Sequence, residues 1–317
     1  NMGMAFMDSG SENPGIRVLH ERVSSVIRGK DKAIKLAVAT LLSRGHLLIE
    51  DVPGVGKTTL AYTLAKAIDC SFQRIQFTSD LLPADIIGVS VFNSETKEFE
   101  FRRGPLFANI VLADEINRTT PKTQSALLEA MNERRVSVER ETHLLDEPFM
   151  VIATQNPLEY RGTFPLPESQ LDRFALNLKL GYPSEEYERL ALSDIKDFGQ
   201  IDSMGPVISG EDVIRMQRDV DGVRVDSSVL DYIMAIITGT REHELVRLGS
   251  STRGGQFLLK CSRALAYYEG RSYIVPDDVK EAAPHVLGHR LMLRKQTSIS
   301  DASRVIKDIL GKVPVPV

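Results

Sequence analysis

Two rhythms of apolar and polar positions divide the chain. Up to about residue 181, short apolar runs alternate with segments whose apolar residues recur every three to four positions. Short runs are typical of buried strands, and the longer period is typical of amphipathic helices. Their alternation predicts a parallel sheet covered by helices on both faces. The strand-like runs are HLLIE (46–50), FQRIQF (72–77), ANIVLADE (108–115), FMVIATQN (149–156) and FALNLKL (174–180).

Helix signals between these runs support the same architecture. In KDKAIKLAVATLLSRG (30–45), Asp31 is a candidate N-cap and Gly45 a candidate end. A second helix continues from Gly56 and Lys57 through TTLAYTLAKAI. Pro121 opens a third at the N1 position, where proline is best tolerated.

Two segments interrupt this rhythm and predict β-hairpins inserted in the α/β core. In 89–105, Val91, Phe99 and Phe101 alternate around a polar turn at Asn93. The segment 134–149, RRVSVERETHLLDEPF, predicts a second hairpin. A stable core does not require either of them, so both are candidates for function.

Beyond Gly181 the pattern becomes helical, which predicts a second, all-α domain. We expect residues 1–16 to be a disordered start or an unrelated remnant, 17–182 the α/β core, 183–312 the helical domain and 313–317 a loose tail. The helical segments are SEEYERLALSDI (184–195), SGEDVIRMQRDV (209–220), DSSVLDYIMAIITGTR (226–241), GGQFLLKCSRALAYY (254–268) and VPDDVKEAAPHVLG (275–288).

Composition narrows the class of protein. The 317 residues carry a net charge of −4 and a pI of about 6.0, so no global charge favours nucleic acid or anionic membrane. Cys70 and Cys261 are too few for a disulfide framework, which fits a reducing cytoplasm. No apolar run approaches the ~20 residues of a membrane span, and NMGMAFMDSG has no signal-peptide pattern. We therefore expect a cytoplasmic protein.

The stretch LLIEDVPGVGKTTLA (47–61) predicts a phosphate-binding loop. The P-loop pattern is G-x-x-x-x-G-K-[ST], and this chain has Asp51 where the first glycine is expected. Backbone N–H groups of such a turn cradle phosphates at a helix N-terminus. Asp51 lies at the strand exit, where we expect its side chain to turn away from the phosphates. The expected nucleotide-binding residues are Pro53, Gly54, Val55, Gly56, Lys57, Thr58 and Thr59.

Within this loop, Lys57 would reach the β- and γ-phosphates, and the Thr58 hydroxyl would be a ligand of Mg²⁺. The alternative is a glycine-rich turn with a surface lysine. Asp114 and Glu115, at the end of IVLADE, make that alternative less attractive. Ligands bind at the carboxyl ends of parallel strands. Asp114 would help to bind Mg²⁺, and Glu115 would polarise the attacking water.

Three further positions are candidates for catalysis. Asn156, at the end of VIATQN, could orient water or sense the γ-phosphate, although an asparagine before proline is usually a turn residue. Arg173 in LDRF could equally be a salt-bridge partner. Arg253 in SSTRGG begins a helix that could lie over the bound phosphates. The six histidines are scattered without metal-ligand spacing, so a structural role is expected.

These features, in this order, resemble the MoxR family of AAA+ ATPases, a helix-2-insert clade related to the magnesium chelatase I subunit. The resemblance extends from about residue 17 to 312. It is carried by EDVPGVGKTTLA, ADEINRTTPKTQSALLEAMNERRV, VIATQNPLEYRGTFPLPESQLDRF and YIVPDDVKEAAPHVLGHRL.

The resemblance implies a P-loop NTPase core with strand order 5-1-4-3-2, an α-helical lid, and a ring, usually hexameric. It implies ATP or ADP with Mg²⁺ as ligands, and the two hairpins look like the helix-2 and pre-sensor-1 inserts. It also assigns sensor 1 to Asn156, sensor 2 to Arg253 and a trans-acting arginine finger to Arg173, and it places Ile27 and Gly29 near adenine. Implied partners are proteins with von Willebrand factor A domains.

Three functions remain open at this stage. The leading hypothesis is a ring ATPase that remodels client proteins during maturation or metal insertion. The second is a nucleic-acid motor, because FRRG and ERRVSVER are locally basic, although acidic residues accompany them. The third is an interaction module switched by nucleotide with little turnover.

Overall fold

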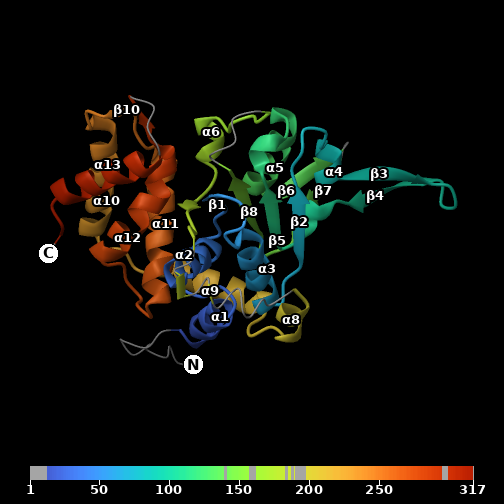
Figure 1. Ribbon diagram of the computed structural model, residues 1–317, viewed down its shortest axis with the longest axis horizontal. Helices are drawn as coiled ribbons and strands as arrows, with labels where there is room; N and C mark the ends of the chain where they lie inside the picture. Colours follow the sequence, from blue (N-terminus) through green and yellow to red (C-terminus); the bar gives the residue numbers. More distant parts are fainter. Residues whose placement is uncertain are drawn as a thin grey trace, which may run out of the picture.

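A computed structural model describes residues 13–138, 141–156, 162–182, 185, 186, 189, 198–294 and 299–316. A five-stranded parallel sheet lies at the centre of the α/β core (Figure 1). All five strand-like runs form its strands, in the order β2-β5-β8-β1-β9. When only these strands are numbered and the sheet is read from β9, this order is the predicted 5-1-4-3-2. The strands are β1 (Leu47–Glu50), β2 (Phe72–Gln76), β5 (Ile110–Asp114), β8 (Met150–Gln155) and β9 (Leu176–Leu178).

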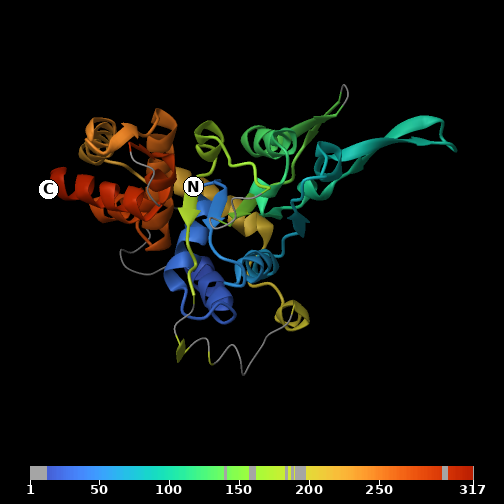
Figure 2. The ribbon, with the colours of Figure 1, turned by 45° about the horizontal axis from the view of Figure 1, so that its top comes forward.

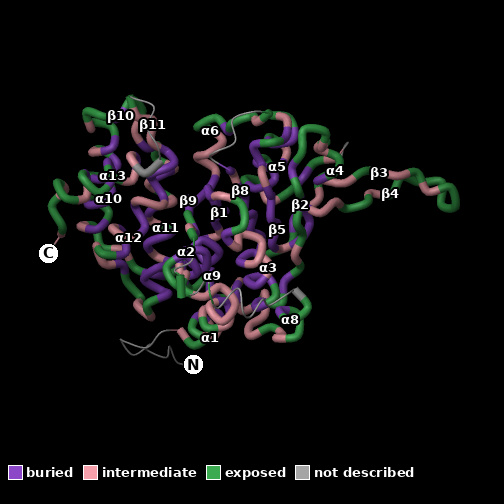
Figure 3. The backbone as a smooth tube through the Cα atoms, viewed as in Figure 1, coloured by how far each residue is buried: buried purple, intermediate pink, exposed green. Residues whose placement is uncertain are grey.

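An apolar cluster covers each face of this sheet. Successive residues of a strand point to opposite faces, so neighbouring residues of β1 belong to different clusters. Leu47 and Ile49 of β1 belong to an apolar cluster with three core helices and the C-terminal helices. Leu48, between them, belongs to a second cluster with α5 and the hairpins. Figure 3 shows the resulting buried centre. The core helices are α1 (Pro14–Ser24), α2 (Asp31–Leu42), α3 (Lys57–Ala67), α4 (Pro83–Ile87), α5 (Pro121–Glu133) and α6 (Glu168–Leu171), with short 3₁₀ turns η1 (Pro105–Phe107) and η2 (Ile116–Arg118).

The predicted helix starts are right at α5 and one residue out at α2. Thr120 is the N-cap of α5, and Pro121 occupies N1 as predicted. The N-cap of α2 is Lys30, so the expectation that Asp31 caps it is wrong. The Asp31 carboxylate instead binds His20 and Ser24, whose hydrogen bonds lower its pKa. Both bonds end on Oδ1 of Asp31, which occupies the first helical position and not the cap.

Two antiparallel hairpins extend from the core. They are β3 (Gly88–Asn93) with β4 (Glu98–Arg103), and β6 (Arg135–Val138) with β7 (Glu141–Leu144). The first projects far from the rest of the molecule (Figures 1 and 2). Phe92 pairs with Phe99, whereas Val91 pairs with Glu100. Phe99 therefore shares its face with Phe92, and Val91 lies on the other face.

The C-terminal part is helical, as predicted, and forms a lid packed on the core. Helix α11 packs against α2 and α12, and α12 also packs against β9. The predicted helix at 184–195 lies almost wholly outside the described residues, and the boundary at 182/183 stays a prediction. No helix in the described ranges has the length and apolarity needed to cross a membrane. The elements are α8 (Phe198–Ser203), α9 (Gly210–Asp221), α10 (Ser227–Glu242), β10 (Val246–Leu248), α11 (Thr252–Tyr268), α12 (Pro276–Leu287), η3 (Gly288–Arg290), β11 (Met292–Leu293) and α13 (Ile299–Lys312).

Candidate nucleotide-binding site

The loop between β1 and α3 has the backbone that a phosphate cradle requires. Gly54 has φ 85° and Gly56 has φ 92°, a left-handed region that L side chains rarely adopt. Helix α3 begins directly afterwards at Lys57. A Cβ built on either glycine meets no atom within 4 Å. The loop therefore opens onto free space at the helix N-terminus, where backbone N–H groups favour anions.

A pocket of about 360 Å³ lies over this loop, and we call it the nucleotide pocket. It brings the predicted P-loop residues together with both predicted carboxylates. Val55 is the exception, because its side chain is buried in the core and only its backbone can contribute. The lining residues are Pro53, Gly54, Gly56, Lys57, Thr58, Thr59, Arg74, Gln76, Asp114 and Glu115.

Asp51 does not face the nucleotide pocket. It is 9% exposed, and its Oδ2 accepts a 2.6 Å hydrogen bond from the backbone N–H of Gly181. Its Oδ1 accepts a 2.9 Å bond from the N–H of Val52. The Lys57 ammonium donates to the Asp51 carbonyl at 2.9 Å. The prediction that this acid turns away is confirmed, and its carboxylate instead joins the P-loop to the chain that leaves β9.

Asp114 is held by two neighbouring strands. The Thr154 hydroxyl of β8 donates to its Oδ1 at 2.6 Å, and the same oxygen of Thr154 accepts the N–H of Glu115 at 2.9 Å. From β2, Arg74 donates to Oδ2 through Nη2 at 2.6 Å and Nε at 3.1 Å. Both carboxylate oxygens thus have partners within the chain. Arg74 fills Oδ2, so Mg²⁺ bound by Asp114 would meet Oδ1 or a water molecule attached to it, unless Arg74 moves.

Glu115 is constrained in backbone and side chain. Its φ of 57° is left-handed, a conformation that costs a non-glycine residue about 1–3 kcal/mol. Thr154 fixes its amide. One oxygen, Oε2, accepts from Gln76 at 2.8 Å and from Arg118 at 3.0 Å. These two donors fill the acceptor sites of Oε2, so proton acceptance by this carboxylate falls to Oε1.

Sequence reasoning missed Arg74, Gln76 and Thr154. A signal for them existed, because Arg74 and Gln76 are alternate polar positions of β2 and share one face. Gln76 is paired with Asp114 on the neighbouring strand β5, so this face of β2 lies beside the carboxylates. Thr154 is a fully buried polar residue within the otherwise apolar β8.

Asn156 follows directly after β8 and is buried. It lies at the same carboxyl edge as Asp114, but it is not one of the described residues that line the nucleotide pocket. Its assignment as sensor 1 stays a prediction.

Ile27 and Gly29 lie in the turn between α1 and α2, where Gly29 has φ 70°. This turn approaches the base of the P-loop, because Lys30 donates to the carbonyl of Tyr182 at 2.7 Å. The preceding residue, Gly181, is bound by Asp51. Neither Ile27 nor Gly29 belongs to the described lining of the nucleotide pocket. Their contact with adenine therefore stays a prediction.

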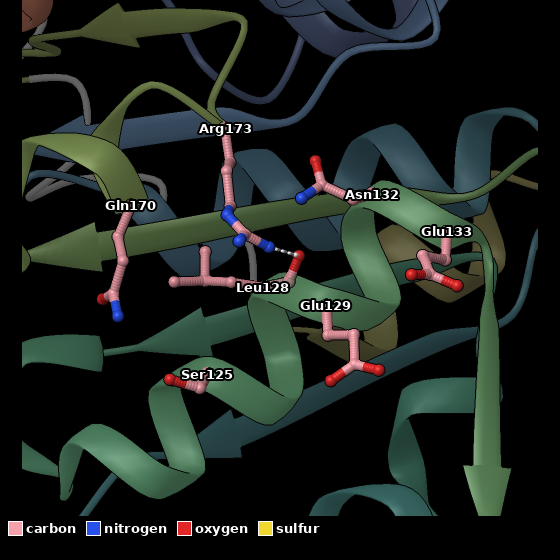
Figure 4. Close-up of a pocket in the computed structure, with 7 residues that line it drawn as sticks. All are labelled: Ser125, Leu128, Glu129, Asn132, Glu133, Gln170 and Arg173. Carbon is pink, nitrogen blue, oxygen red and sulfur yellow. Dashed lines mark hydrogen bonds between the residues drawn. The ribbon is translucent and has the colours of Figure 1, made fainter.

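Arg173 belongs to a second pocket of about 290 Å³, which we call the arginine pocket (Figure 4). Its guanidinium points toward α5 and donates to the carbonyl of Leu128 at 2.9 Å. Arg253, at the start of α11, donates to the Asn132 side chain. The pocket is lined by Ser125, Leu128, Glu129, Asn132, Glu133, Gln170 and Arg173.

The two pockets lie at opposite ends of the sheet. Asp114 ends β5, whereas Arg173 precedes β9, and all five strands are parallel. A four-residue strand spans roughly 13 Å. Arg173 therefore cannot reach its own P-loop without rearrangement of the core. Arg253 contacts α5 near the arginine pocket, so within this chain it does not lie over the P-loop, contrary to expectation.

His46, His285 and His289 each contact a backbone carbonyl. His46 accepts the N–H of Val151 at Nδ1 and contacts the Met131 carbonyl through Nε2. Burial lowers its pKa to about 4, so the ring is neutral near pH 7. Burial also lowers the pKa of His285 and His289. The described part of the chain contains no cluster of three or more histidine, cysteine or acidic side chains suited to a metal ion.

Comparisons with known proteins agree with this geometry. Residues 46–176 match the model of the ATPase family associated with various cellular activities, and 238–309 match an AAA lid domain. A protein of Bacillus subtilis, the uncharacterized YeaC, is 50% identical over 299 residues, covering 94% of this chain and 93% of its own length. Chaperone MoxR1 of Mycobacterium tuberculosis is 40% identical over 306 residues, covering 93% of this chain and 80% of its own.

A solved structure supports the fold at the same level. The crystal structure of an ATPase candidate from Cytophaga hutchinsonii is 36% identical, with a TM-score of 0.86. The match covers 96% of this chain and 95% of that one. The fold and the nucleotide pocket define an α/β P-loop NTPase of the AAA+ class, with a C-terminal helical lid. Within that class, the chain belongs to the MoxR family of AAA+ ATPases.

Proposed function

We propose that this protein binds and hydrolyses ATP with Mg²⁺ at sites shared between neighbouring subunits of a ring. The observation that carries the proposal is the placement of Asp114 and Glu115 at one end of a parallel sheet and Arg173 at the other. A head-to-tail ring would bring one subunit's arginine pocket to the next subunit's nucleotide pocket. Membership of a family whose members typically form rings supports this assembly, and we propose a hexamer.

In the nucleotide pocket, the backbone of Gly54 and Gly56 would cradle the phosphates. Lys57 would leave the Asp51 carbonyl to reach the β- and γ-phosphates. Thr58 and Asp114 would hold Mg²⁺, which neutralises phosphate charge. Oxygen donors of this kind, combined with substrate phosphates, are how Mg²⁺ is usually bound, so these residues fit the ion.

Glu115 would act as the general base that accepts a proton from the attacking water, with Asn156 orienting that water. Gln76 and Arg118 both bind Oε2, so Oε1 of Glu115 would be the oxygen that accepts the proton. The third hypothesis, a nucleotide switch, would correspond to a protein in which this proton transfer does not occur.

Arg173 would act in trans, stabilising charge that develops on the neighbour's γ-phosphate. Arg253 would approach the same nucleotide, since its partner Asn132 lines the arginine pocket. Arginine fingers contribute roughly 10³–10⁵ in turnover. This placement replaces the expectation that Arg253 covers the phosphates of its own subunit.

The work done by hydrolysis would be chaperone-like remodelling, in maturation or metal insertion, of proteins such as those with von Willebrand factor A domains. The similarity to a protein named Chaperone MoxR1 supports this class of work. The projecting hairpin exposes Phe92 by 53% and Phe99 by 69%, a surface suited to apolar polypeptide.

Three arginines of the two locally basic segments are paired with acidic side chains. Arg103 pairs with Asp146, Arg134 with Glu147, and Arg135 with Glu133. These ion pairs reduce the positive charge available to phosphates, which weakens the case for a nucleic-acid motor.

Two variants test the proposal. Glu115→Gln should bind ATP with normal affinity and release no phosphate, because it lacks the base. Arg173→Ala should bind ATP and assemble normally but lose roughly 10³-fold or more in turnover. Phosphate release, nucleotide anisotropy and light scattering with ATP and Mg²⁺ measure these properties. Wild-type turnover by an assembled Arg173→Ala ring would refute the shared site.

A further inference from the structure

Arg290, a buried side chain of the lid, forms hydrogen bonds with the chain on both sides of Arg173. Arg290 is only 6% exposed and belongs to η3. Its Nε donates to Asp172 Oδ1 at 2.8 Å, and its Nη2 donates to the Asp172 carbonyl at 3.2 Å. It also donates to the carbonyls of Phe174 and Ala175. The residues before and after Arg173 are thus bound to the same guanidinium.

A second lid residue contacts the same carboxylate. The Ser251 hydroxyl lies 3.3 and 3.2 Å from the two carboxylate oxygens of Asp172. Ser251 is also the N-cap of α11, the helix that carries Arg253. The Phe257 ring of α11 lies 5.0 Å from the Arg290 guanidinium and 5.8 Å from that of Arg253. The lid therefore contacts the segment 172–175 through η3 and through the N-terminus of α11.

The charge of Arg290 is retained in this position. Burial lowers its pKa to about 10, an effect that Asp172 opposes, so the group stays protonated near pH 7. A buried ion pair gives little net stability compared with apolar packing of the same volume. Its geometry is more informative, because a planar guanidinium presents five N–H donors in a fixed fork. Here that fork fixes the direction in which the chain passes through Arg173.

We propose that Arg290 is a positioning residue that orients Arg173 for the nucleotide of the neighbouring subunit. It acts through Asp172 and the adjacent carbonyls and contacts no nucleotide itself. Movement of the lid would then change hydrolysis in the next subunit through the arginine pocket. This inference rests on the proposed function, since it requires Arg173 to act in trans.

The test compares Arg290→Met with a matched lid variant, Arg271→Met. Arg271 forms a comparable ion pair with Asp278, through bonds of 2.7 and 2.6 Å, but both residues lie within the lid. Displacement of a catalytic group by about 1 Å costs roughly 10²-fold in rate. Arg290→Met should therefore lose roughly 10- to 100-fold in kcat with unchanged ATP affinity. Arg271→Met should lose stability but keep kcat within about two-fold.

Subunit mixing separates a trans effect from general damage. Lys57→Ala subunits, which lack nucleotide binding but keep the arginine edge, are mixed with Arg290→Met subunits. If Arg290 acts through Arg173 in trans, mixing restores phosphate release, as it should for Arg173→Ala subunits. Restoration with Arg173→Ala but not with Arg290→Met would overturn the inference and leave the shared site intact. Failure of Arg173→Ala to be restored would refute the shared site and the inference together.

Asp172→Asn guards against a folding failure of Arg290→Met, because it keeps the shape of Asp172 while it removes the charge and replaces one acceptor oxygen by an NH₂ donor. It should lower kcat in the same direction, by a smaller factor, and should also be restored by Lys57→Ala subunits. Wild-type kcat in both Arg290→Met and Asp172→Asn would contradict the positioning role.

Discussion

The nucleotide pocket and the arginine pocket are built in different ways. The first is made by backbone turns and strand ends of the α/β core, with Gly54, Gly56 and Asp114 within one continuous sheet. The second depends on α5 and, through Arg290 and Ser251, on side chains of the lid. If the proposed function is right, nucleotide binding would be a property of the core, whereas the trans contribution to its hydrolysis would be open to control by the lid.

Lys57→Ala should give the largest effect and should affect only the nucleotide pocket. Loss of the ammonium that reaches the phosphates should weaken ATP binding by at least about 100-fold, or ~2.7 kcal/mol. Anisotropy of a fluorescent ATP analogue measures this affinity. Lys66→Ala, in the same helix and paired with Asp202, is the matched control and should bind normally. Binding within a few-fold of wild type by Lys57→Ala would remove Lys57 from the phosphate site.

Thr154→Val should have an intermediate effect. It keeps the side-chain shape but removes the donor to Asp114 and the acceptor for the Glu115 amide. Misplaced carboxylates should lower kcat by about 10- to 100-fold while ATP affinity stays within a few-fold. Thr40→Val serves as control, because Thr40 is equally buried and its hydroxyl only bonds Leu36 within α2. Unchanged phosphate release by Thr154→Val would show that the carboxylates need no support from β8.

Asp51→Gly should have the smallest effect on nucleotide binding. Its carboxylate accepts hydrogen bonds from the N–H groups of Gly181 and Val52 and does not face the nucleotide pocket. ATP affinity should therefore stay within a few-fold. Stability should fall by about 1–3 kcal/mol, because two backbone donors lose their acceptor. Thermal unfolding and ATP titration measure the two quantities separately. A large gain in ATP affinity would mean that the acid's charge reaches the phosphates.

Local patterns predicted the core well. All five strands, the hairpins, the P-loop and the carboxylate pair follow from runs and motifs only a few residues long. Contacts between distant segments could not be predicted in this way. Asp51 and Gly181 are 130 residues apart, and Arg290 is 118 residues from Asp172. Nothing in the residues near Arg290 indicates which segment it binds, because that depends on how the lid packs.

Smaller errors have the same origin. Asp31 satisfies the rule for an N-cap, but its Oδ1 binds His20 and Ser24 of α1, and the helix begins at Asp31 itself. Arg253 begins a helix that the sequence places after the core, yet the lid packs so that this helix end meets Asn132 on α5. In each case the local rule was sound, and a tertiary contact overrode it.

We propose that the two pockets of one chain act on two different nucleotides, its own and that of the neighbouring subunit. The most direct test mixes Lys57→Ala and Arg173→Ala subunits, each inactive alone, and measures phosphate release from the assembled rings. At equal proportions, roughly a quarter of randomly formed interfaces pair an intact nucleotide pocket with an intact arginine pocket. We expect recovery of about that fraction of wild-type turnover. Mixed rings that assemble but stay as inactive as either variant alone would contradict it.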